Sequence, residues 1–262
     1  MHTASPSTAA SVLQGRIPAL SSLAAFVEEE RLKTTERLPF SVRIVRSGED
    51  LERAIALRYE AYARHMPEFA QKLRQAEPDD FEADSIILLA ESRIDGSVIG
   101  TMRIQNNSYR PLSMEHSISL PDVYKGQSMV EVRRLGVAKG ASGRLVKMVL
   151  IKACLLYCEK NNIQWAMVAA RPPLDQSYEK LMFIDVMPGK TFTPLPTANN
   201  VPHRVMAFQI DGYEGRLIEA KHQLHGFFCG THHPDIDVNA ASSFNFPREY
   251  DRRQQRAEQA FT

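Results

Sequence analysis

The chain has 262 residues, of which 44% are hydrophobic, and its formal net charge at pH 7 is +1. This length and composition suffice for one domain with a full hydrophobic core. The near-neutral charge argues against a protein whose main ligand is nucleic acid, because that affinity comes from many basic residues. No apolar run reaches the roughly 18 residues of a membrane span, and no secretory signal pattern is present. We therefore expect a cytoplasmic protein without a transmembrane segment.

The pattern of apolar residues predicts three regions along the chain. Residues 1–38 are expected to form a tail with an amphipathic helix at 17–33, residues 39–238 the main domain, and residues 239–262 a polar tail. Alternating or β-branched runs predict strands at 41–46, 85–92, 97–105, 128–137, 164–170 and 204–210. Helical spacing predicts helices at 49–65, 142–161, 174–182 and 213–228, the second of them with Ser142 at its N-cap.

This order of elements predicts an α/β domain with a mixed, mostly antiparallel central sheet flanked by helices. The Asp95-Gly96 pair lies between two strand-like runs and predicts a hairpin. The strand at 128–137, the following helix and the strand at 164–170 form a parallel crossover. A ligand is therefore expected at the carboxyl ends of these two strands.

The three cysteines are too few for a disulfide framework. Cys154 and Cys158 fall in an apolar, helix-like run, and Cys229 stands apart from them. We expect all three to be reduced packing residues.

Two charged residues, Glu131 and Arg134, interrupt the otherwise apolar strand at 128–137. Residues three apart on a strand point to opposite faces unless a bulge intervenes. One interpretation makes Glu131 a general base for an attacking amine and Arg134 a holder of a carboxylate or phosphate. The alternative is that both belong to exposed ion pairs on an edge strand.

A run of acidic residues follows the first helix of the main domain. It contains Glu77, Asp79, Asp80, Glu82 and Asp84, without one basic residue. Carboxylates this dense require a cation. Arg58 is a candidate, because it shares the apolar face of its helix, and Arg103 in the strand at 97–105 is another. A solvated acidic loop is the alternative.

A basic stretch begins in the strand that carries Glu131 and continues into the next helix. Its members are Arg133, Arg134, Lys139, Arg144, Lys147 and Lys152. Such a patch on a neutral chain fits an acidic protein or a phosphate-bearing arm. An ordinary solvated helix face is the alternative.

Ligand-type side chains gather in a segment near the end of the main domain, which contains His222, His225, Cys229, His232 and His233. One interpretation of this segment is a metal site. Its spacing matches no strong zinc pattern. We therefore predict no metal and expect these histidines to cap or pack against the last helix.

Four short motifs, in this order, resemble the Gcn5-related N-acetyltransferase fold, and in particular its branch that uses acyl carrier protein. That branch comprises the long-chain N-acyl amino acid synthases and the acyl-homoserine-lactone synthases. The motifs are Arg58 with Tyr62 four residues later, Asp79-Asp80-Phe81-Glu82, the strand from Val98 that ends in Arg103, and Glu131-Val-Arg-Arg134-Leu-Gly-Val137. The resemblance extends over about residues 41–210.

Two departures narrow the resemblance. Acyl-CoA enzymes of this fold have a glycine-rich loop whose amides bind pyrophosphate, and the sequence from Lys139 to Arg144 does not have its spacing. This favours a protein-borne acyl donor. The homoserine-lactone synthases have a Trp shortly after the first helix, whereas the single Trp here is Trp165 in a late strand. The acceptor is therefore expected to be an ordinary amino acid.

The resemblance implies an acyltransferase that moves a long fatty acyl group from acyl carrier protein to an amino acid amine. The donor group would be an acyl-phosphopantetheine, no cofactor would be tightly bound, and nucleic acid would not be a partner. The implied catalytic residues are Glu131, Arg134 and Arg103. The implied acceptor-side residues are Arg58, Tyr62, Asp80, Glu82 and Asp84, and the implied donor-side residues are Leu135, Val137, Lys139, Arg144 and Lys147.

Two alternatives remain open at this point. The chain could be an acyl-homoserine-lactone synthase that consumes S-adenosylmethionine. It could also be a non-catalytic acyl-binding or lipid-binding protein, because a fold does not fix a function. The sequence leaves the oligomeric state, the accepting amino acid and the acyl chain length undetermined.

Overall fold

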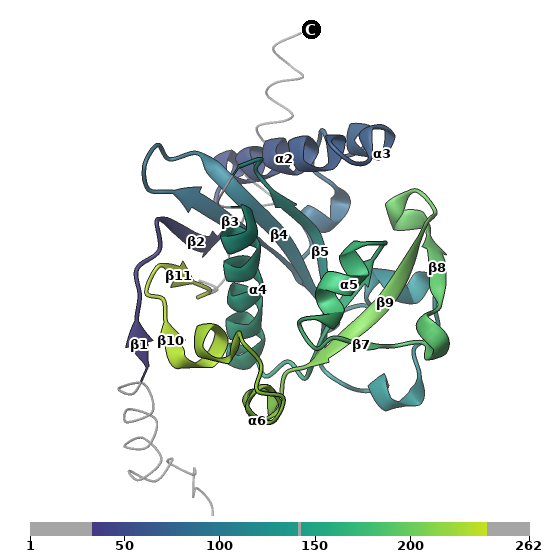
Figure 1. The fold of residues 1–262 in the computed structure, drawn as a ribbon. Helices are drawn as coiled ribbons and strands as arrows, with labels where there is room; N and C mark the ends of the chain where they lie inside the picture. Colours follow the sequence, from purple (N-terminus) through teal and green to yellow (C-terminus); the bar gives the residue numbers. More distant parts are fainter. Residues whose placement is uncertain (1–32, 141–142, 240–262) are drawn as a thin grey trace, which may run out of the picture.

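A computed structural model describes residues 33–140 and 143–239. The predicted helix at 17–33 lies outside the described residues except for Lys33, and so do Ser142 and nearly all of the predicted C-terminal tail. The described part shows an α/β arrangement in which helices cover both faces of a large sheet (Figure 1). No helix of this part is long and apolar enough to cross a bilayer.

The strands and helices have the following bounds. The strands are β1 (Thr34–Thr35), β2 (Phe40–Ile44), β3 (Ser85–Ser92), β4 (Val98–Asn106), β5 (Met129–Val137), β6 (Trp165–Ala170), β7 (Ile184–Asp185), β8 (Phe192–Leu195), β9 (Val201–Gln209), β10 (Thr231–His232) and β11 (Ile236–Asp237). The α-helices are α2 (Gly48–Ala63), α3 (Pro67–Gln71), α4 (Gly143–Lys160), α5 (Leu174–Glu179) and α6 (Tyr213–Glu219).

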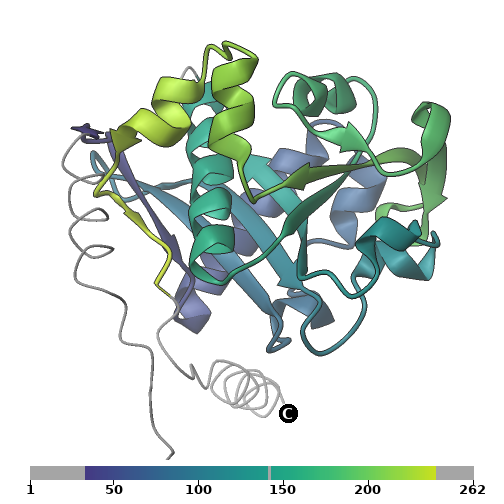
Figure 2. The ribbon, with the colours of Figure 1, turned by 90° about the horizontal axis from the view of Figure 1, so that it is seen from below.

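Within the described residues, nine strands form one sheet in the order β11-β2-β3-β4-β5-β6-β9-β7, with β8 also paired to β9. The β2-β3-β4-β5 run is antiparallel, and β5 and β6 are parallel. The C-terminal segment returns past α4 and adds β11 in parallel beside β2 (Figure 2). This is the mixed, mostly antiparallel sheet that the sequence predicts.

Helices α2 and α4 pack on opposite faces of the sheet. On the α4 side, Val146 and Leu150 join the main core with Met102 of β4. Gly100 permits this close contact, since a Cβ there would lie 2.5 Å from Cγ1 of Val146. On the other face, Leu51 of α2 packs with Leu89 in a second cluster. The polar residues of β4 and β5 on the α2 face are therefore buried beneath a helix and its following loop.

Most of the predicted elements are confirmed, with two kinds of difference. The prediction of one continuous helix at 213–228 is wrong. Helix α6 ends at Glu219, and Lys221 adopts a left-handed φ of 47°. A separate π-helical turn, Gly226–Gly230, follows. The short strands β1, β7, β8, β10 and β11 were not predicted, because two to four residues give no detectable alternation. The three cysteines are free and buried, as expected.

Candidate active site

A β-bulge in β5 positions the central residues of the site. Arg103 of β4 pairs with Arg133, but Thr101 pairs with Gly136, so β5 contains one extra residue between these pairs. Arg134 lies in this bulge with a left-handed φ of 54°. As a result Glu131 and Arg134 both reach the α2 side of the sheet, where Arg134 contacts Glu77. The sequence spacing alone would have placed them on opposite faces.

The strands β5 and β6 separate immediately before the bulge. Their last paired residues are Val132 and Val168, although β5 continues to Val137 and β6 to Ala170. Beyond this point the backbone of β5 has no ladder partner on its β6 side. An extended ligand can therefore form hydrogen bonds with the β5 backbone between the two strands.

A cavity of about 300 Å³ opens at this separation. Its walls come from α2, the α2–α3 connection, β5, α4, the end of β6, α5 and the segment around β8 and β9. The residues that line it are Ala61, Tyr62, Arg64, His65, Met66, Phe69, Glu131, Val132, Arg133, Arg134, Leu135, Gly136, Val137, Lys147, Ala169, Ala170, Arg171, Leu174, Tyr178, Leu195, Thr197, Ala198 and His203. The cavity thus lies at the carboxyl ends of the two parallel strands, where the sequence predicts a ligand.

Glu131 is the carboxylate on this wall, within the part of the chain that the structure describes. Its side chain is buried and accepts a hydrogen bond of 3.0 Å from the backbone N–H of Met114. Burial raises the pKa of Glu131, although Arg133, 3.5 Å away, opposes this effect. A carboxyl group with a raised pKa inside a cavity is suited to accept a proton during a reaction.

The acidic run after α3 lies against the arginines of the sheet. Arg58 donates two hydrogen bonds to Asp80, at 2.9 and 2.7 Å, and Arg103 donates one at 2.8 Å. Arg103 also lies 3.2 Å from Glu77. Both arginines and Asp80 are buried. The predicted interaction of Arg58 and Arg103 with the acidic run is confirmed, and the alternative of a solvated loop is wrong for these residues.

The same network reaches the cavity through β5. Arg134 donates to both carboxylate oxygens of Glu77, at 2.7 and 2.6 Å, and its guanidinium lies 5.1 Å from the ring centre of Phe69. Arg133 donates to Asp79 at 2.8 Å. Burial opposes ionisation of Glu77, but the hydrogen bonds and charge of Arg134, with the charges of further arginines, lower the pKa of Glu77 to about 2. These contacts fix the bulge to the 77–84 segment.

Several predicted acceptor-side residues take other positions. Arg103, which the resemblance implies to be catalytic, has 1% of its surface exposed and does not line the cavity. Glu82 is exposed and lies away from the cavity lining. Asp84 is buried and binds Arg110, with one contact of 2.8 Å. Tyr62 does line the cavity.

The predicted donor-side residues divide into two groups. Leu135, Val137 and Lys147 line the cavity, whereas Lys139 and Arg144 are exposed outside it. Burial lowers the pKa of Lys147, whose amine lies 5.6 Å from the ring centre of Tyr178.

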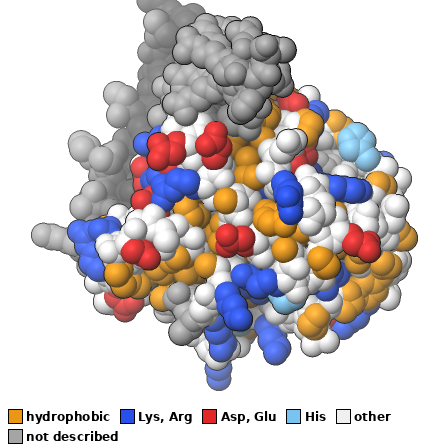
Figure 3. All heavy atoms as spheres, turned by 90° about the horizontal axis from the view of Figure 1, so that it is seen from above, with side chains coloured by type: hydrophobic (Ala, Val, Ile, Leu, Met, Phe, Trp, Pro, Cys, Tyr) orange, Lys and Arg blue, Asp and Glu red, His pale blue; other side chains and the backbone are white. Residues whose placement is uncertain are grey.

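The predicted basic patch of six residues does not form one surface. Arg133 and Arg134 are buried in ion pairs with the acidic run. Lys152 is buried on α4, where it donates to the carbonyl of Phe227 at 2.6 Å. On the face seen from the α2 side, basic, acidic and hydrophobic side chains are intermixed (Figure 3). Lys139, Arg144 and the half-buried Lys147 remain for contact with a partner.

The cavity residues that sequence reasoning missed include His203, Arg171 and Tyr178. His203 is buried, and its Nδ1 lies 2.7 Å from the carbonyl of Val201. Burial lowers the pKa of His203, and the positive charges of Arg171 and Arg134 lower it further. The guanidinium of Arg171 has no hydrogen bond or ion pair within the described ranges. Burial raises the pKa of Tyr178. These residues come from three separate elements, so no local sequence pattern links them.

The fold, together with the family match reported next, identifies an N-acyltransferase with a Gcn5-related N-acetyltransferase-like fold. The family model for the N-acyl amino acid synthase FeeM matches residues 53–205. The chain belongs to this family. A search of curated proteins found no match.

Two solved structures show the same fold at low sequence identity. The first is FeeM, an N-acyl amino acid synthase from uncultured soil microbes, with a TM-score of 0.53 and 16% identity over 70% of this chain and 96% of that chain. The second is BjaI, a CoA-dependent acyl-homoserine lactone synthase, with a TM-score of 0.50 and 15% identity over 80% of this chain and 98% of that chain. The predicted resemblance and fold class are confirmed.

The substitution Glu77→Gln tests the ion network through the pH dependence of stability. Because the pKa of Glu77 is about 2 in the folded chain and about 4.5 ordinarily, its carboxylate stabilises the fold above about pH 4.5. This contribution is lost as the pH falls towards 2, and the two pKa values correspond to about 3 kcal/mol. In urea unfolding, the free energy of unfolding of the wild type should exceed that of Glu77→Gln by about this amount at pH 7 and by clearly less at pH 3.

The control is Glu82→Gln, which removes an exposed carboxylate from the same acidic run. Its free energy of unfolding should stay within about 0.5 kcal/mol of the wild type at both pH values. An equal gap between wild type and Glu77→Gln at pH 7 and pH 3 would contradict the assigned role of Glu77.

Proposed function

We propose that this chain transfers a long-chain fatty acyl group from acyl carrier protein to the amine of an amino acid. The observation that carries the proposal is the buried carboxyl of Glu131 on the wall of a cavity where β5 and β6 separate. Membership of the N-acyl amino acid synthase family supports it. The cytoplasmic location expected from the sequence belongs to the same proposal.

The proposed chemistry needs one base and one proton donor. The acceptor nitrogen attacks the thioester carbonyl, Glu131 takes the proton that the nitrogen loses, and the carbon–sulfur bond breaks as the amide forms. Tyr178 lines the cavity and its raised pKa keeps its hydroxyl protonated, so it can donate a proton to the leaving sulfur. Backbone groups around Leu135 and Val137, left without a β6 partner, would bind the phosphopantetheine arm and the thioester oxygen.

Arg171 is our proposed anchor for the acceptor carboxylate. It lines the cavity, and no ion pair or hydrogen bond engages its guanidinium in the described part of the chain. Arg134, by contrast, is bound to Glu77 through two hydrogen bonds. The free guanidinium of Arg171 can therefore bind a carboxylate without breaking an existing contact.

The preference for acyl carrier protein rests on the donor side of the site. The segment from Lys139 to Arg144 lacks the spacing of a pyrophosphate-binding loop. Lys139 and Arg144 are exposed beside the start of α4, in a position to contact an acidic protein. BjaI is described as CoA-dependent, so coenzyme A is the competing donor in the test below.

The substitution Glu131→Gln tests the proposed base. Turnover should fall by about 100- to 10,000-fold, because the amide cannot accept the proton. In the wild type, kcat/KM should decrease as the pH falls through the pKa of Glu131, and burial places this pKa above its ordinary value of 4.5. Stopped-flow or endpoint assays of thiol release across pH 4 to 8 would measure both effects.

The control is binding of the acyl donor, which Glu131→Gln should leave unchanged because the amide oxygen still accepts from Met114. Wild-type turnover in the variant would refute the role of Glu131 as the base.

A direct comparison of acyl carrier protein with acyl-CoA as the thioester donor tests the proposed donor. At equal concentrations, long-chain acyl carrier protein should support faster transfer to an amino acid than the matching acyl-CoA, with mass spectrometry identifying the N-acyl product. The double substitution Lys139→Glu with Arg144→Glu should raise the KM for acyl carrier protein and leave that for acyl-CoA nearly unchanged. Lys125→Glu, an exposed charge before the opposite end of β5, is the matched control. Faster transfer from acyl-CoA would contradict the proposed donor.

The substitution Arg171→Gln tests the acceptor anchor. The KM for the amino acid should rise by about 10- to 100-fold, the usual value of a hydrogen bond to a charged group, with kcat at saturation largely retained. A matched amine that lacks the carboxylate provides the control, because its KM should be the same in wild type and variant. An unchanged KM for the amino acid would rule out this role for Arg171.

A further inference from the structure

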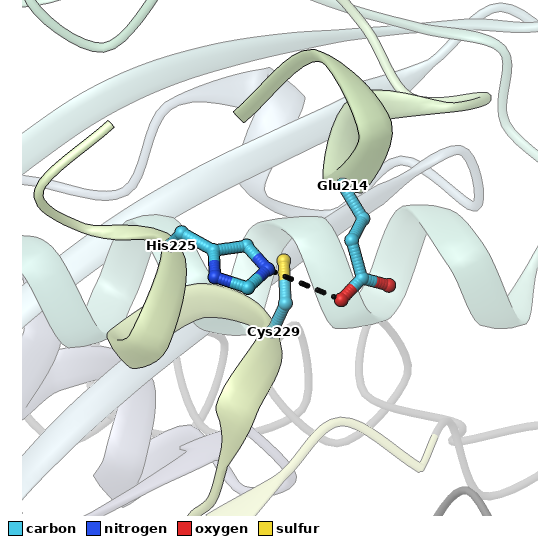
Figure 4. A group of neighbouring side chains, drawn as sticks. All are labelled: Glu214, His225 and Cys229. Carbon is cyan, nitrogen blue, oxygen red and sulfur yellow. Dashed lines mark hydrogen bonds and ion pairs between the residues drawn. The ribbon is translucent and has the colours of Figure 1, made fainter. Parts of the chain in front are cut away.

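Three side chains of metal-binding type converge outside the cavity. Glu214 lies in the first turn of α6, His225 immediately precedes the π-helical turn, and Cys229 lies within that turn (Figure 4). Nε2 of His225 lies 3.3 Å from Oε1 of Glu214. The three potential ligand atoms all lie within 4.8 Å of one another. None of these residues lines the cavity described above.

The turn that carries Cys229 is fixed to α4 by a buried amine. Lys152 donates to the carbonyls of Phe227 and Thr231, which flank Cys229 on either side. The same amine lies 3.0 Å from Nδ1 of His233. A π-helical turn is rare and often marks a functional position. The backbone that carries Cys229 is therefore anchored to α4 on both sides of this residue, which fixes the position of one of the three ligands.

The chemistry of the three groups favours one class of ion. A thiolate and an imidazole are the ligands that zinc prefers, and a carboxylate oxygen completes many zinc sites. The side chains of Glu214 and His225 are 50% and 35% exposed, so solvent can provide a fourth ligand. We propose that Glu214, His225 and Cys229 bind a zinc-type divalent cation.

A cation at this position would link α6 to the segment that follows it, in addition to their shared packing in the main core. Glu214 belongs to α6, whereas Cys229 leads into β10 and the C-terminal segment that reaches the sheet edge at β11. The ion would tie both segments together over α4. The unfolded chain does not hold the three ligands together. A cation that binds only the folded chain should therefore raise the stability of the fold.

This proposal departs from the sequence-based prediction of no metal. Of the residues considered there, His222 instead lies with Nε2 2.9 Å from the carbonyl of Lys180, and His233 contacts Lys152. Glu214 was not considered, because it lies in α6 and is brought to Cys229 only by the break after that helix.

Zinc binding to the full, untagged chain tests the proposal. After dialysis against a chelator, calorimetric titration with Zn²⁺ should show one saturable site, and Zn²⁺ should raise the melting temperature. Co²⁺ should produce a thiolate-to-cobalt absorption band that is absent in Cys229→Ser. Cys229→Ser, His225→Ala and Glu214→Gln should each weaken Zn²⁺ binding by more than about tenfold.

The controls are His222→Ala and Cys158→Ser, which remove ligand-type side chains outside the cluster and should bind Zn²⁺ like the wild type. Glu214 is exposed, so Glu214→Gln should have the wild-type melting temperature in the presence of chelator, which separates loss of binding from loss of folding. The absence of saturable binding by the wild type, or wild-type affinity in Cys229→Ser, would overturn the proposal. Neither result depends on the acyl-transfer assays.

Discussion

The ion pairs between residues 77–84 and the arginines of the sheet are the constraint on which the site depends. Arg58 comes from α2, Arg103 from β4 and Arg134 from the β5 bulge, and all three meet Glu77 or Asp80. Buried charges of this kind are costly unless each has its partner, so loss of one side chain leaves several others unpaired. The helix, two strands and the acidic segment are therefore fixed relative to one another by one shared electrostatic requirement.

The same pairing decides which charged groups remain available inside the cavity. Arg133 and Arg134 line it, but their charges are matched by Asp79 and Glu77. Arg171 retains an unmatched guanidinium among the described residues, and Glu131 a carboxyl whose pKa is raised by burial. Arg64 and Lys147 also line the cavity, and Arg64 donates to the carbonyl of Val137. In the proposed reaction, an amine with a carboxylate would thus meet one buried base and cations that no carboxylate within the described residues pairs, Arg171 among them.

The sequence predicted strands β2 to β6 and β9 well, because their apolar periodicities are long and the Asp95-Gly96 turn is distinctive. It also indicated Glu131, since a charge in an apolar strand stands out. It could not predict the complete burial of Arg103, because burial of that guanidinium depends on a loop folding over β4. His203 and Arg171 escaped prediction for a related reason: only the β6–β9 pairing brings these distant residues to one wall.

In the proposed reaction, strand β5 lies between the groups that would bind the acyl donor and those that would bind the acceptor. The β5 bulge places Glu131 and Arg134 on the α2 side of the sheet. The backbone beyond Val132 has no β6 partner and lines the cavity together with residues of α4 and α5. Donor contacts can thus be made largely by backbone, whose hydrogen bonds do not depend on side-chain identity. In the proposed reaction, acceptor contacts would come from side chains on α2, on β9 and just after β6.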